Sequence, residues 1–103
     1  MTPEQGEIWW AEARDKRRPV LVVTRSSAIP ALTTILVAPV TRKVRGIPTE
    51  IALGASDGLR EACAASFDNL QPVRRTALTA RVAGDGVARH GAICRALRAM
   101  ADC

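Results

Sequence analysis

A dense run of aliphatic residues, entered through two arginines and a proline, most constrains what this chain can fold into. Arg17-Arg18-Pro19 leads directly into Val20–Thr24. Valine and leucine dominate this run, which is typical of a buried strand, and we predict a strand over 18–24. Proline has no N–H and belongs at the first residue of a strand. The arginines are then expected at the strand's entrance, where an anionic ligand could reach them, although a solvated pair beside a core strand would leave the same pattern.

The rest of the chain alternates short apolar segments with turns that contain glycine or proline. Further strands are predicted over 6–12, 33–41, 48–53 and 78–82, with a hairpin connector at 13–17, a basic loop at 42–46 and an extended segment at 68–73. Pro39 puts its strand at an edge or marks a bulge or a strand end. Residues 58–67 are ambiguous, because their apolar spacing is helical but their neighbours are strands.

The clearest helix is predicted at the tail, over 87–100, with Asp85 as a plausible N-cap. One arc of this helix carries Val87, His90, Ile93, Cys94, Leu97, Met100 and Ala101. Many short strands followed by one helix indicate a mainly β, α+β chain built as a small barrel. A length of 103 residues fits a single domain over 1–103.

Adjacent tryptophans stand in the first predicted strand. Because side chains alternate across a strand, Trp9 and Trp10 point to opposite faces. One is expected in the core and the other partly exposed. An exposed tryptophan could stack on a nucleic-acid base, but closing a dimer interface is the favoured reading.

The formal net charge is +5, and all but two of the basic residues are arginines. Guanidinium groups match phosphate in two-point geometry, so the charge favours nucleic acid or an acidic protein segment as partner, although codon bias could produce the same composition. The three cysteines form no CxxC pair, which argues against a zinc site or a disulfide framework. No signal-peptide pattern or membrane-spanning run is present, and a reducing cytoplasm is expected.

Few residues offer obvious catalytic chemistry. The only histidine, His90, falls on the apolar arc and is expected to be partly buried rather than catalytic. No nucleotide-binding or hydrolase motif occurs, so an enzyme built on this chain is expected to need no metal and no cofactor. Cleavage of RNA by its own 2′-hydroxyl fits such a set of residues, because an arginine beside a hydroxyl could orient and neutralise the reacting phosphate.

Four short fragments, in their order along the chain, are characteristic of a known family. They are 6–11 (Gly-Glu-Ile-Trp-Trp-Ala), 17–23 (Arg-Arg-Pro-Val-Leu-Val-Val), 37–41 (Val-Ala-Pro-Val-Thr) and 48–51 (Pro-Thr-Glu-Ile). Together they closely resemble the MazF/PemK family of toxin endoribonucleases from bacterial toxin–antitoxin systems. The resemblance implies an SH3-like barrel over about 5–83 with a helix at about 86–101, and it resolves residues 62–67 as a strand.

The same resemblance implies a homodimer that cleaves single-stranded RNA, leaving a 2′,3′-cyclic phosphate and a 5′-hydroxyl. The expected target is messenger RNA, with transfer or ribosomal RNA as further options. It also implies a cognate antitoxin whose acidic and apolar tail covers the RNA groove. The net charge of +5 is compatible with both partners.

Residue roles carry over one position at a time. Arg18 matches the family's arginine before the Pro-Val-Leu-Val strand, which implies phosphate binding and stabilisation of developing charge. Thr41 matches the threonine that closes the Ala-Pro-Val-Thr strand, which implies contact with the scissile phosphate or the 2′-hydroxyl. Asp68 and Asn69 match an acidic–amide pair, which implies base contacts, with Asp68 also a candidate general base. We further assign Arg17, Arg42 and Lys43 to RNA binding as electrostatic contributors.

Three departures from the family pattern bear on function. The connector 13–17 is shorter than the usual first loop, Ser66 stands where some members carry an arginine, and Gln71 stands where a phosphate-facing arginine is usual, unless Arg74 or Arg75 replaces it. Two other readings stay open. One is a gyrase-poisoning toxin similar to CcdB, which the absence of an aromatic residue near the chain end disfavours. The other is an RNA-binding barrel without catalysis.

Overall fold

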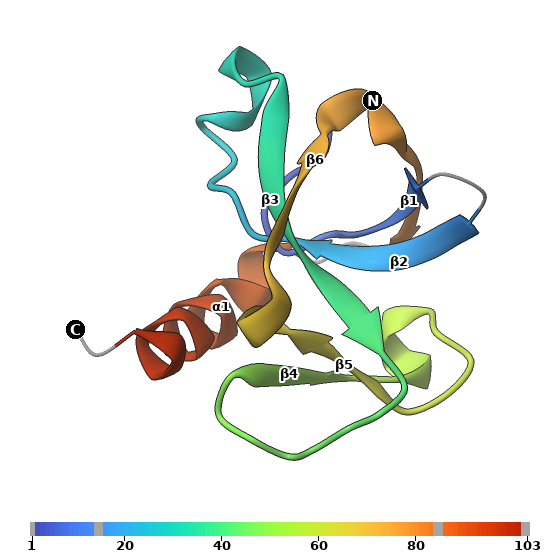
Figure 1. The fold of residues 1–103 in the computed structure, drawn as a ribbon, viewed down its shortest axis with the longest axis vertical. Coiled ribbons are helices and arrows are strands. Elements are labelled where there is room, and N and C mark those ends of the chain that lie inside the picture. Colours follow the sequence, from blue (N-terminus) through green and yellow to red (C-terminus); the bar gives the residue numbers. More distant parts are fainter. Residues whose placement is uncertain (1, 14–15, 84–85, 102–103) are drawn as a thin grey trace.

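A computed structural model describes residues 2–13, 16–83 and 86–101 of the chain. Within these ranges the strands are β1 (Ile8–Ala13), β2 (Lys16–Val22), β3 (Thr34–Thr41), β4 (Glu50–Leu53), β5 (Cys63–Ser66), β6 (Gln71–Arg74) and β7 (Leu78–Ala83), and the helix is α1 (Gly86–Met100). Short 3₁₀ turns η1 (Ile29–Ala31), η2 (Ala55–Asp57), η3 (Phe67–Asn69) and η4 (Arg75–Ala77) punctuate them. The mainly β chain with a C-terminal helix is therefore confirmed (Figure 1).

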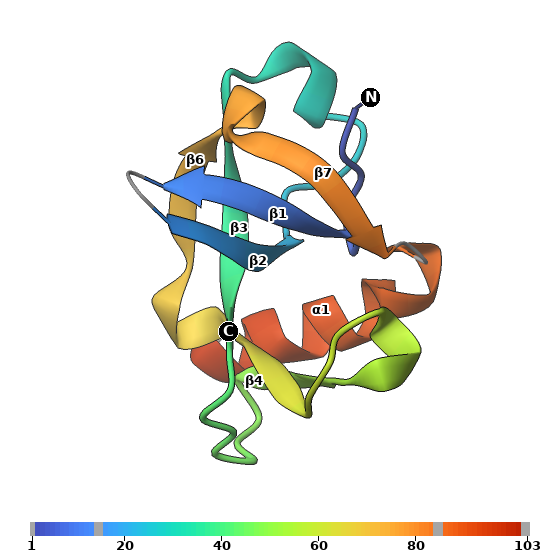
Figure 2. The ribbon, with the colours of Figure 1, turned by 90° about the vertical axis from the view of Figure 1, so that its right-hand side faces the viewer.

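The strands form one antiparallel sheet in the order β4-β5-β3-β2-β1-β7, with β6 also paired to β3. The expectation of a barrel needs one correction, because the sheet curls without closing and its end strands β4 and β7 do not pair. Instead, α1 lies across the open side (Figure 2). Its Ile93 and Ala96 share a core with Leu53 of β4, and Val82 of β7 packs against that core. The helix thus completes a core that the strands leave open.

Residues 20–22 of strand β2 are buried on both faces of the sheet, which accounts for the unbroken apolar run there. Val20 and Val22 pack with the core on one face of the sheet, whereas Leu21 packs with the core beneath α1. The strand runs from Lys16 to Val22 rather than over 18–24. It starts earlier because the hairpin is tight: Ala13 already pairs with Lys16.

The tryptophans divide as predicted. Trp9 is 3% exposed and its Nε1 donates to Glu7 Oε1 over 3.0 Å, whereas Trp10 is half-buried. Burial works to raise the pKa of Glu7, but hydrogen bonds from Trp9, the Glu4 N–H and Arg81 prevail and hold that pKa below its usual value. This carboxylate therefore ties β1 to β7 through Arg81, whose Nη1 lies 3.0 Å from Glu7 Oε2.

The ambiguous segment contains a strand. All four residues of β5 are buried, and β5 lies between β3 and β4. Packing on both faces therefore overrides the helical spacing. The expected extended run 68–73 begins later, at Gln71, because Asp68 and Asn69 belong to the 3₁₀ turn η3.

The tail helix is confirmed, and it contacts β4 and η3. Its buried line is Ile93 and Ala96, with Leu97 packed against the same core. His90 is exposed, which corrects the expectation of partial burial: among the described helix residues, those in the core begin only at Ile93, one turn later. The proposed cap Asp85 lies outside the described residues. No helix in the described ranges is long and apolar enough to cross a membrane.

Candidate RNA-binding site

A cavity of about 820 Å³ opens where strands β2 and β3 stop pairing and diverge. Only residues 20–22 of β2 pair with β3, so the arginine-bearing start of β2 pairs with β1 alone. β3 in turn pairs with β6 up to Val37 and with β5 from Val40. Pro39 falls in the interval between these two partners, and it lines the cavity with Pro19. Pro19 of β2 and Pro39 of β3 thus mark the place where the site opens.

The cavity brings together five of the seven predicted site residues: Arg17, Arg18, Thr41, Arg42 and Asn69. Lys43 and Asp68 are not among the residues that line it. Lys43 is exposed beyond the end of β3, and Asp68 is exposed in η3. The two can contribute to binding only around the cavity, not inside it.

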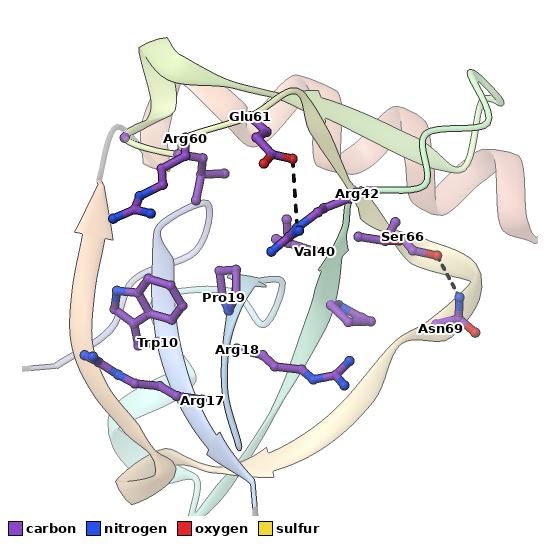
Figure 3. Close-up of a pocket in the computed structure, with 14 residues that line it drawn as sticks. Trp10, Arg17, Arg18, Pro19, Val40, Arg42, Arg60, Glu61, Ser66 and Asn69 are labelled. Atoms are coloured by element: carbon purple, nitrogen blue, oxygen red, sulfur yellow. Dashed lines mark hydrogen bonds and ion pairs between the residues drawn. The ribbon is translucent and has the colours of Figure 1, made fainter. Parts of the chain in front are cut away.

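The two arginines of β2 are not equivalent. Arg17 lies over the Trp10 ring, 4.9 Å from its centroid, and its Nε is 3.7 Å from Glu12 Oε1. In Figure 3 its side chain turns toward Trp10, whereas that of Arg18 extends the other way, toward the side where Asn69 lies. Among the described residues no carboxylate lies within ion-pair distance of Arg18. The guanidinium of Arg18 is therefore available to bind an incoming phosphate.

The Thr41 hydroxyl is set for donation. Its Oγ1 accepts a hydrogen bond from the Lys43 N–H over 3.1 Å as the chain turns out of β3. A hydroxyl carries one proton and two lone pairs. With one lone pair in use, the proton remains available for a phosphate or a ribose oxygen in the cavity. Lys43 thus contributes to the site through its backbone N–H, which positions the Thr41 hydroxyl, rather than through its ammonium group.

The two members of the acidic–amide pair, Asp68 and Asn69, have hydrogen-bond partners in different parts of the fold. Asp68 Oδ2 accepts from the Thr49 hydroxyl over 2.7 Å, which fixes η3 against the start of β4. Asn69 Nδ2 donates to Ser66 Oγ over 2.9 Å, and both of these residues line the cavity. Asn69 thereby keeps its side-chain carbonyl oxygen available for a base edge. Ser66, which stands where some family members carry an arginine, orients this amide.

Sequence reasoning missed Arg60 and Glu61, which line the cavity from the segment between η2 and β5. Glu61 Oε2 lies 4.0 Å from Arg42 Nε, so this pair links the segment to the end of β3 (Figure 3). The only signal was a charged pair just after Gly58, whose φ is +81° and which ends a turn. Nothing in the spacing placed that pair opposite the β2 arginines.

The balance of charge suits a polyanion. Four arginines line the cavity, and Glu61 is the one carboxylate among its described lining residues. Residues 2–13, 16–83 and 86–101 contain no group of three or more metal-ligating side chains that could hold a metal ion. A basic cavity with an available hydroxyl can bind a phosphodiester and stabilise charge that develops on it.

Comparison with known families supplies the identification. Residues 4–100 match the family of PemK-like, MazF-like toxins of type II toxin–antitoxin systems. The chain belongs to this MazF/PemK family. A probable endoribonuclease of Mycobacterium tuberculosis, MazF5, is 40% identical over 103 residues, which cover 98% of this chain and 94% of the relative.

Solved structures agree with the family assignment. The Mycobacterium tuberculosis toxin MazF-mt6 superposes with a TM-score of 0.79 at 35% identity, covering 89% of this chain and 92% of that one. A mycobacterial endoribonuclease in complex with its cognate antitoxin gives a TM-score of 0.77 at 23% identity, covering 93% and 91%. The second likeness supports the fold alone, and both confirm the mainly β architecture with one C-terminal helix.

Proposed function

We propose that this MazF/PemK chain is an endoribonuclease toxin, a single domain over 1–103 that cleaves single-stranded RNA without a metal ion. The family match and the MazF5 relative, a probable endoribonuclease, support the activity. The observation that carries the proposal is the cavity that holds both Arg18 and the donating hydroxyl of Thr41. In this proposal the toxin acts in the cytoplasm as a homodimer, and its cognate antitoxin blocks the same cavity.

The proposed reaction uses a nucleophile that the substrate supplies. The ribose 2′-oxygen attacks the adjacent phosphorus, and the bond to the 5′-oxygen breaks, giving a 2′,3′-cyclic phosphate and a 5′-hydroxyl. Arg18 binds the phosphate and stabilises the negative charge that builds up on its oxygens. Thr41 donates to the same phosphate or holds the 2′-hydroxyl in line. Asn69, oriented by Ser66, and Trp10 contact bases. Arg17 and Arg42 attract the RNA phosphates in the cavity, and Lys43 adds positive charge around it.

In this proposal Asp68 contacts RNA bases and is not the general base. Its carboxylate is engaged by the Thr49 hydroxyl and does not line the cavity, so we assign it to contacts with flanking bases rather than to proton abstraction. Thr49 is itself buried, which holds η3 in a fixed position. Asp68 thereby also positions the neighbouring Asn69.

The activity is tested by incubating the purified chain with a long RNA in EDTA and identifying the new ends. Cleavage that leaves 5′-hydroxyl ends and continues in EDTA supports the proposal. Binding without cleavage would favour a catalytically inactive RNA-binding protein. Intact RNA together with trapped gyrase–DNA complexes would instead identify a gyrase poison.

We expect Thr41→Val to reduce the cleavage rate at saturating RNA by about tenfold to a hundredfold, because one hydrogen bond to the reacting groups is lost. Thr41→Ser keeps the hydroxyl and serves as the matched control, with a rate near that of the wild type. Single-turnover cleavage of a fixed RNA measures both. Equal rates for Thr41→Val and Thr41→Ser would remove Thr41 from the mechanism.

We expect Glu61→Gln to tighten RNA binding by a few-fold. Glu61 competes with phosphate for Arg42, but the pair is exposed and its Nε–Oε2 distance is 4.0 Å, so the gain is under about 1 kcal/mol. Fluorescence anisotropy at several salt concentrations measures it, with Glu50→Gln as the control outside the cavity. Unchanged binding with a slower cleavage step would contradict this role and identify Glu61 as a proton acceptor.

A further inference from the structure

A chain of hydrogen bonds links the N-terminal segment to α1, away from the cavity. Gln5 Nε2 donates to the Val23 carbonyl over 2.9 Å, and Gln5 Oε1 lies 3.0 Å from His90 Nδ1. His90 Nε2 in turn lies 3.7 Å from Cys94 Sγ. None of Gln5, His90 and Cys94 lines the RNA cavity. The family assignment accounts for none of these three side chains.

The partners of each atom fix where the protons lie. The Val23 carbonyl can only accept, so the amide nitrogen of Gln5 faces it and the amide oxygen faces His90. That oxygen also only accepts, so Nδ1 of the neutral imidazole carries the ring proton. Nε2 is then an unprotonated nitrogen directed at the Cys94 thiol. The order thiol, imidazole base and orienting acceptor is the arrangement that activates a nucleophilic cysteine.

The two described cysteines differ in access. Cys63 is buried in β5, and burial raises the pKa of its thiol, with Asp57 and Glu61 acting in the same direction. Cys94 is only partly buried, one helical turn after His90 on α1. A reactive cysteine needs both a base and an approach for the reagent. Of these two thiols, only Cys94 has both.

We propose that Cys94 is a modification site that forms mixed disulfides with low-molecular-weight disulfides. His90 Nε2 takes the thiol proton as Cys94 Sγ attacks one sulfur of the disulfide. The disulfide's S–S bond breaks, and the departing thiolate receives the proton from His90. The cysteine is oxidised and the departing sulfur is reduced, so electrons balance. Gln5 is a positioning residue that holds His90 in the required tautomer.

The test exposes the reduced 103-residue chain to glutathione disulfide, the small probe, and stops the reaction at intervals with acid. Trypsin then places Cys63, Cys94 and Cys103 in separate peptides, 61–74, 90–95 and 99–103, so that mass spectrometry follows each thiol by itself. We expect Cys94 to be modified faster than Cys63. The His90→Gln variant should slow modification of Cys94 by about tenfold or more, because the base is lost.

A variant pair at Gln5 separates positioning from folding. Gln5→Met removes the acceptor for His90 Nδ1 and should slow Cys94, whereas Gln5→Glu keeps an acceptor and should retain at least the wild-type rate. Thermal melting establishes that each variant is folded. Equal Cys94 rates in wild type and folded His90→Gln overturn the proposal, as does a Cys94 rate no higher than that of Cys63. Both readouts are independent of RNA cleavage.

Discussion

Arg18→Ala is expected to lower the rate of RNA cleavage at saturating substrate by roughly 30- to 1,000-fold, which corresponds to about 2–4 kcal/mol of lost transition-state stabilisation. Arg18 lines the cavity without a carboxylate partner among the described residues, so its guanidinium is free to follow charge onto the reacting phosphate. Arg17 is shared between Trp10 and Glu12 and should contribute mainly to binding. Single-turnover kinetics on a defined RNA separate the two effects.

Two matched controls sharpen this result. Arg17→Ala removes the neighbouring charge and should weaken binding several-fold with little change in the rate of the bound complex. Arg45→Ala removes an exposed arginine that does not line the cavity and should leave both nearly unchanged. If Arg18→Ala cleaves like Arg45→Ala, the proposed active site is wrong, whereas a loss shared equally by Arg17→Ala would mean that only total charge matters.

The fold could be predicted where a segment's own pattern agreed with its surroundings. The apolar run of β2, the split of Trp9 and Trp10 and the tail helix all follow from periodicity. The strand within residues 62–67 could not be predicted from periodicity, because burial between β3 and β4 overrides the helical spacing of these residues. Only the resemblance to the family identified this strand. The open sheet also escaped prediction, since nothing local indicates that α1 rather than a β4–β7 pairing completes the core.

The candidate site was predictable where its residues lie on strands next to the prolines. Arg18 and Thr41 stand beside the point where β2 and β3 diverge, which Pro19 and Pro39 mark in the sequence. Arg60 and Glu61 could not be placed, because the segment between η2 and β5 reaches the cavity only through tertiary packing. The β1–β2 connector is tight, with Ala13 already paired to Lys16. Arg60 and Glu61 supply polar contacts to the cavity from its other side.

Arg89→Met is expected to destabilise the chain by about 3 kcal/mol. The variant removes an ion pair between α1 and η2, the turn that precedes Arg60 and Glu61. Arg89 of α1 pairs with Asp57 of η2, and its Nη1 donates to the Gly6 carbonyl over 2.8 Å. The two side chains are only 13% and 20% exposed, so the variant leaves a largely buried carboxylate without its cation. For a domain of this size the loss lowers the melting temperature by about 10–20 °C.

Arg98→Met is the matched control, because it makes the same substitution at an exposed position of the same helix and should change the unfolding free energy by less than about 0.5 kcal/mol. Adding Asp57→Asn to Arg89→Met removes the orphaned charge and should recover part of the loss. Equal melting temperatures for Arg89→Met and Arg98→Met would show that the pair does not anchor the helix. Because Asp57 directly precedes the segment that carries Arg60 and Glu61, Arg89→Met should also weaken RNA binding under conditions where the chain stays folded. Stability and the shape of the cavity would then depend on the same contact between α1 and η2.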